Sequence, residues 1–78
     1  MTNEEALRWI ADVFDEPREN IAPEMRRSDV KAWDSLGILA LMARFDEDLD
    51  VFLTEAEVQQ FRTIDDILQS LRKHGRLS

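Results

Sequence analysis

The stretch WDSLGILALMARFDEDL, residues 33–49, leads from an irregular polar segment into a long apolar helix. Asp34 and Ser35 are both favoured helix N-caps, so we expect a helix from Leu36 to about Leu49 with one of them as its cap. Two sets of apolar residues recur along this helix at spacings of three and four. The first set is Ile38, Leu41, Met42, Phe45 and Leu49, and the second is Leu36, Leu39, Ala40 and Ala43.

A helix that is apolar on most of its sides is either central or has a second partner. A chain of 78 residues buries one modest core, so one of the two apolar stripes is expected to stay exposed for binding. The alternative is that both stripes pack inside, against the first helix and the long connection that precedes residue 33. The spacing of the residues does not choose between these two arrangements.

Two more amphipathic helices flank this segment. Residues 4–14 should form the first, capped by Asn3, with an apolar stripe of Leu7, Ile10, Ala11 and Phe14. Residues 64–73 should form the last, capped by Thr63 and ending before Gly75, which suits the left-handed position after a helix.

A short helix should precede the last one. Thr54 and Glu57 have the spacing of a capping box, which predicts a helix that starts there and ends near Gln60. The three apolar residues before the box, 51–53, predict a buried connector, and Phe61 after the helix is a candidate core residue.

Residues 16–33 show no sustained periodicity and include two prolines. Long connections without secondary structure are uncommon in compact domains unless they have a function. We expect a short helical turn over residues 29–32, and four apolar residues that hold the connection to the core: Ile21, Met25, Val30 and Trp33. The whole chain, 1–78, is thus predicted to be one all-α domain, a four-helix bundle with a long first loop and a short third helix.

The charge pattern limits the function. The net charge is −7, and residues 34–66 carry nine acids and two bases, which disfavours nucleic acid and favours basic protein partners. There is no cysteine for a disulfide or a zinc–thiolate site. Neither a signal peptide nor an apolar run of membrane-spanning length is evident, so a cytoplasmic monomer is expected.

Catalytic groups are scarce, and we predict that the protein is not an enzyme. His74 is the only histidine and follows the last predicted helix, where it suits the negative end of the helix dipole. Acids at residues 46–50 lack the pattern of a calcium loop and suggest a solvated patch, with no metal site. Ser35 has no evident base to activate it, so it is either a simple cap or an attachment point, where a phosphate would meet the positive end of a helix dipole.

At Asp34-Ser35-Leu36, and over nearly its whole length, the chain resembles the stand-alone bacterial acyl carrier proteins. The likeness includes the long first connection, the acidic end of the helix after the serine, and the capped last helix. It implies a 4′-phosphopantetheine arm, derived from coenzyme A, on Ser35, and acyl groups held on the arm as thioesters. It also implies a role for Asp34 in positioning the serine.

The resemblance implies several partners and a surface that binds them. The partners would be a phosphopantetheinyl transferase and the ligase or synthase enzymes that load acyl groups. The docking surface would lie on the helix after the serine, and we assign to it Leu36, Leu39, Ala43, Asp46 and Glu47.

The chain departs from the fatty-acid type of carrier at Gly37 and Ala40, where acids are usual. This departure suggests a specialised lipid or secondary-metabolite pathway, and Gly37 is expected to loosen the first turn of the helix. Two other functions stay open. One is an aminoacyl or peptidyl carrier, although the usual Gly-Gly before the serine is missing; the other is a helical interaction module in which Ser35 is merely a cap.

Overall fold

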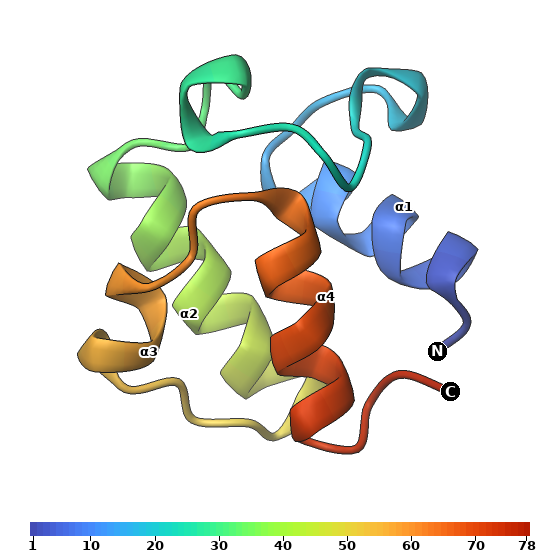
Figure 1. Cartoon of the computed structure of the whole chain (residues 1–78). Helices are drawn as coiled ribbons and strands as arrows, with labels where there is room; N and C mark the ends of the chain where they lie inside the picture. Colours follow the sequence, from blue (N-terminus) through green and yellow to red (C-terminus); the bar gives the residue numbers. More distant parts are fainter.

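Capping residues and apolar periodicity produce four α-helices, which form an all-α bundle (Figure 1). The structure, a computed structural model, describes all 78 residues. The helices are α1 (Asn3–Val13), α2 (Ser35–Leu49), the short α3 (Glu55–Gln59) and α4 (Ile64–Lys73). No strand forms, and the last residues of the chain return to the first, where the Ser78 amide donates to the Met1 carbonyl at 2.8 Å.

Helix α1 starts one residue earlier than the sequence predicted. Its N-cap is Thr2, whose hydroxyl accepts from the amide of Glu5, while the Glu5 carboxylate accepts from the amide of Thr2. The prediction of Asn3 as the cap was therefore wrong, because only Thr2 has a glutamate three residues later to complete a capping box. The box at Thr54 forms as predicted, Thr63 caps the helix at residues 64–73 as predicted and also forms a box with Asp66, and that helix has the predicted bounds.

The first connection is irregular but firmly attached. It has two 3₁₀ turns, η1 (Arg18–Asn20) and η2 (Arg27–Asp29), so the predicted turn at residues 29–32 lies two residues too late. Of the four residues predicted to hold it, Ile21, Val30 and Trp33 are buried and Met25 is half-buried. Backbone hydrogen bonds also join it to the start of α4, from Ile64 to Met25 and from Asp65 to Pro23.

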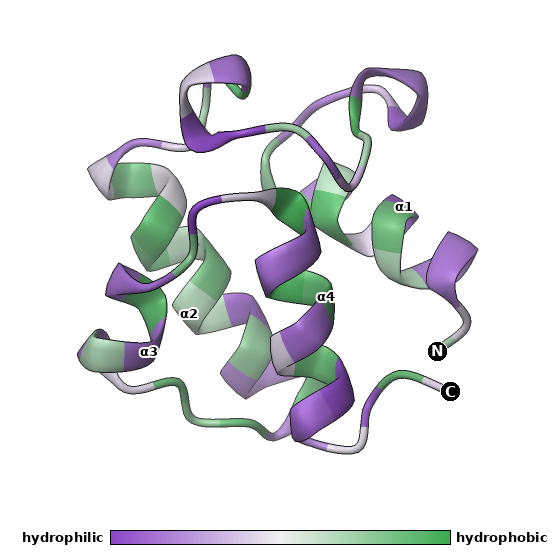
Figure 2. Ribbon diagram, in the orientation of Figure 1, coloured by the Kyte–Doolittle hydropathy of each residue, from purple (hydrophilic) through white to green (hydrophobic).

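The core contains 19 buried apolar residues drawn from every α-helix and from the first connection. Helix α2, which is largely hydrophobic in Figure 2, contributes its first stripe to this core. Leu41 and Phe45 are buried in the core, and Ile38, Met42 and Leu49 are partly buried against it. The second stripe stays outside, because Leu36 and Leu39 are 76% and 62% exposed. The arrangement with both stripes inside is therefore excluded.

The connector before α3 is only partly buried. Val51 and Leu53 are buried as predicted, but Phe52 between them is 79% exposed. The prediction of a fully buried connector was wrong for Phe52, because side chains alternate in direction along an extended segment. Phe61 is buried, as predicted for a residue that anchors the end of α3.

Gly37 closes the junction between the first connection and α2. It is buried, and a Cβ built on it would lie 1.9 Å from the Ala32 carbonyl oxygen and 3.4 Å from the Phe14 ring. The Phe14 ring in turn stacks on Trp33, with centroids 5.4 Å apart. Gly37 is therefore required by a close backbone approach, and it faces the interior of the bundle, not a docking partner.

We predict that Gly37→Ala destabilises the fold even though alanine is the better helix former. Overpacking against a backbone carbonyl costs about 1–3 kcal/mol, which exceeds the gain of about 1 kcal/mol in helix propensity. The melting temperature should fall by about 5 °C or more, measured by circular dichroism.

The exposed position Ala43 is the matched control for this substitution. Ala43→Gly should lose about 1 kcal/mol from propensity alone, so glycine should be favoured at 37 and alanine at 43. A Gly37→Ala variant as stable as the wild type would contradict the close approach.

Candidate functional site

Ser35 is the first residue of α2, and its hydroxyl is not used to cap the helix. The N-cap is Asp34, whose Oδ1 accepts from the amide of Gly37 at 3.0 Å and whose carbonyl accepts from the amide of Ile38 at 2.9 Å. The helix therefore starts at Ser35, one residue before the predicted Leu36, and Ser35 is exposed. This leaves the Ser35 side chain free for another role.

Ser35 opens onto a groove of about 490 Å³ between α2 and α3. Its apolar lining comes from Ile38, Leu39, Met42 and Val58. Polar side chains complete the groove, with Glu55 and Gln59 on α3 and Arg27 on the first connection. The site is thus a free serine hydroxyl at one end of an open, half-apolar groove.

The five residues predicted to form a docking surface all lie exposed on α2: Leu36, Leu39, Ala43, Asp46 and Glu47. Their spacing puts them on one face of the helix. The surface has an apolar half next to Ser35 and an acidic half further along.

One of the acids near the end of α2, Asp48, is engaged within the protein. Asp48 accepts from the indole Nε1 of Trp9 at 2.8 Å and from Arg44 at 2.7 Å, and Arg44 also pairs with Asp12 at 3.0 Å. These bonds, the one from Trp9 first, lower the pKa of Asp48. Because Asp48 and Arg44 join α1 to α2, Asp46 and Glu47 remain for a partner.

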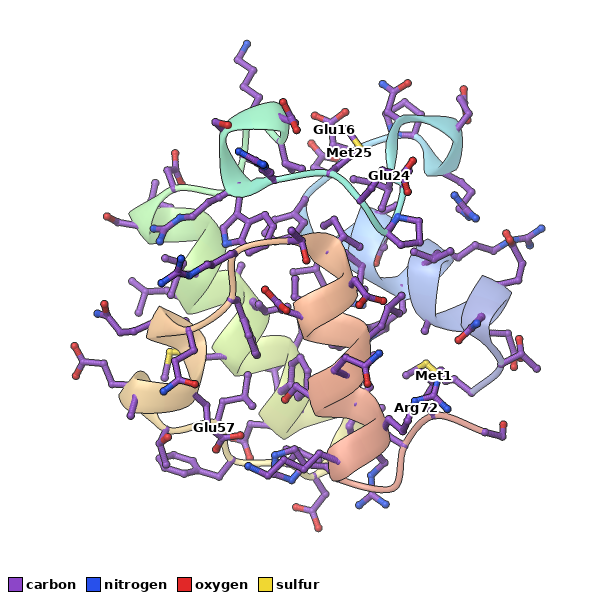
Figure 3. The ribbon with its side chains drawn as sticks, in the orientation of Figure 1. Met1, Glu16, Glu24, Met25, Glu57 and Arg72 are labelled. Atoms are coloured by element: carbon purple, nitrogen blue, oxygen red, sulfur yellow. The ribbon has the colours of Figure 1, made fainter.

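The α3 wall of the groove is attached to α4 by one side-chain pair. His74 Nε2 lies 3.0 Å from Glu57 Oε2, and Figure 3 shows Glu57 between α3 and the end of α4. The hydrogen bond to His74 lowers the pKa of Glu57. His74 is the C-cap residue of α4, and its side chain joins this helix end to α3 through Glu57.

No protein-family model matches the chain. A search of curated proteins finds no relative. The site is therefore interpreted from its own chemistry.

The structure brings no three metal-binding side chains together, and none of its helices has the length and apolarity to cross a membrane. The sequence pointed to Ser35, Asp34 and the α2 residues but missed Arg27, Glu55, Val58 and Gln59. The capping box at Thr54 predicted α3 itself, but no local signal shows that α3 forms one wall of the groove.

Because Asp34 is the cap, we predict different stability effects for the two neighbouring residues. Asp34→Ala should cost about 1 kcal/mol of unfolding free energy, whereas Ser35→Ala should change it by less than about 0.5 kcal/mol. Urea unfolding of both variants measures the difference. Equal losses would mean that Ser35 shares the capping role.

We also predict that the Glu57–His74 pair stabilises the protein only above acidic pH. Because the fold lowers the pKa of Glu57, the stabilisation is present above the ordinary glutamate value of about 4.3 and is lost as the pH falls through the lower, folded value. Glu57→Gln should therefore cost about 0.5 kcal/mol at pH 6 and less at pH 3, measured by urea unfolding.

Glutamine preserves the capping box with Thr54, so Glu57→Gln tests the ionic contribution to the pair. Glu47→Gln, at an exposed position, is the matched control, and its effect on the free energy of unfolding should be the same at pH 6 and pH 3. A loss for Glu57→Gln that is equal at pH 6 and pH 3 would contradict the pair.

Proposed function

We propose that this protein is an acyl carrier, with a 4′-phosphopantetheine arm on Ser35. The observation that supports this most is the free state of Ser35: it is exposed, it heads α2, and Asp34 does the capping in its place. A serine in this position serves no evident structural purpose, but it is accessible to a modifying enzyme.

The residues around Ser35 fit such an arm. The groove beside it offers Ile38, Leu39, Met42 and Val58 to an apolar cargo. A phosphate on the serine would also meet the positive end of a 15-residue helix. The arm itself supplies a terminal thiol on which an acyl group is held as a thioester.

Attachment requires a partner enzyme, because the Asp34 carboxylate beside Ser35 is engaged with the Gly37 amide and no basic side chain is hydrogen-bonded to the serine hydroxyl. A phosphopantetheinyl transferase would join Ser35 Oγ to the β-phosphorus of coenzyme A, and the P–O bond to adenosine 3′,5′-bisphosphate would break. The serine proton would pass to a base of the transferase. Asp34, exposed beside Ser35, would help to position the serine in that complex.

The α2 surface suggests the chemistry of the partners. Leu36, Leu39 and Ala43 would fit an apolar patch, and Asp46 and Glu47 would attract basic groups at its edge. Transferase, ligase and synthase partners would share this surface. Gly37 is buried and is not part of the docking surface, so the absence of an acid at this position gives no information about the pathway. The proposal of a specialised pathway is based instead on the apolar character of the first half of α2.

The proposal predicts that the protein gains one arm when incubated with coenzyme A and a broad-specificity phosphopantetheinyl transferase. Intact mass spectrometry should show a single addition, absent in Ser35→Ala. Ser28→Ala, at another exposed serine, is the matched control and should be modified like the wild type. No addition to the wild type, or an addition to Ser35→Ala, would overturn the function.

Loading of the modified protein then separates the kinds of cargo. A fatty-acyl adenylating enzyme should transfer its acyl group to the arm. Transfer from amino-acid adenylating enzymes alone would instead identify an aminoacyl carrier.

A further inference from the structure

Arg27 lines the groove together with Ser35, although the two residues are eight positions apart in the sequence. It is the first residue of η2, and its amide donates to the Arg62 carbonyl at 3.1 Å. Its guanidinium Nε donates to the Trp33 carbonyl at 3.5 Å. The backbone of Arg27 is therefore attached to the segment before α4, and its side chain to Trp33, two residues before Ser35.

The remaining guanidinium N–H groups of Arg27 have no protein partner. No carboxylate lies within ion-pair distance, whereas Arg18 and Arg44 have acidic partners at 2.8 and 2.7 Å. Asp34, next to Ser35, holds the amide of Gly37, and Glu55 lines the groove from α3. An arginine without an ion-pair partner, in a strongly acidic protein, thus lines the same groove as the serine.

A planar guanidinium forms paired hydrogen bonds with phosphate oxygens more readily than any other side chain. The phosphate of an arm on Ser35 would lie at the same groove as Arg27. The negative charge of Glu55 would repel that phosphate from α3, and the positive charge of Arg27 would attract it. The apolar lining of the groove would then remain free for the cargo.

We propose that Arg27 is a positioning residue that binds the phosphate of the arm on Ser35 and so fixes where the arm enters the groove. This inference rests on the proposed carrier function. It gives the first connection a specific role, which is separate from the docking of partners on α2.

The test compares Arg27→Gln with Arg26→Gln, which removes a neighbouring exposed arginine outside the groove. Each protein is prepared without the arm and with the arm. The ³¹P resonance of the loaded proteins is measured in buffer and in urea, and the melting temperature is measured for both forms.

For the wild type and Arg26→Gln, the folded ³¹P shift should differ from the urea value, and loading should raise the melting temperature. In Arg27→Gln the folded shift should move toward the urea value, and the gain in melting temperature should fall by at least half. Arg27→Lys keeps the positive charge but loses the planar guanidinium, so its ³¹P shift and its gain in melting temperature should lie between those of the wild type and Arg27→Gln.

Three results would overturn the inference. An Arg27→Gln protein with the wild-type shift and gain would show that Arg27 does not bind the phosphate. A folded Arg27→Gln that takes no arm where Arg26→Gln does would assign Arg27 to transferase docking instead. A wild type that takes no arm would refute the carrier function itself, and the inference with it.

Discussion

The close approach of Gly37 to the Ala32 carbonyl determines how the first connection joins α2. A side chain at this position would hold the two backbones apart, because no rotamer can remove a Cβ. Trp33 then stacks on Phe14 and anchors the same junction to α1. Ser35 is exposed at the start of α2, between the buried residues Trp33 and Gly37, which lie two positions away on either side.

The same junction explains the composition of the candidate site. Asp34 satisfies the free amide of Gly37, so Ser35 has no structural duty. The connection carries Arg27 to the groove, while α3 supplies Val58 and Glu55 from the other side. The acids of α2 also have separate roles. Asp48 joins α1 to α2 through its bonds with Trp9 and Arg44, whereas Asp46 remains exposed on the surface.

Most of the helical framework was predictable because its signals are local. Thr54, Thr63 and Gly75 mark helix ends through bonds that span at most five residues, and the stripe of α1 from Leu7 to Phe14 is buried as its spacing predicts. The errors were small shifts in helix ends. For example, Asn3 was predicted as the cap of α1 in place of Thr2, because both are good caps and only Glu5, three residues after Thr2, distinguishes them. Phe52 was misjudged because its burial depends on which way an extended segment turns.

The order of the residues was enough to specify four capped helices, one surplus apolar stripe on α2 and a serine at its start. Each of these depends on neighbours within one or two helical turns. Only the folded arrangement revealed that Gly37 faces inward, that Asp34 alone is the cap, and that Arg27 and Val58 share a groove with Ser35. These features depend on contacts between segments far apart in the chain, which no local pattern of residues encodes.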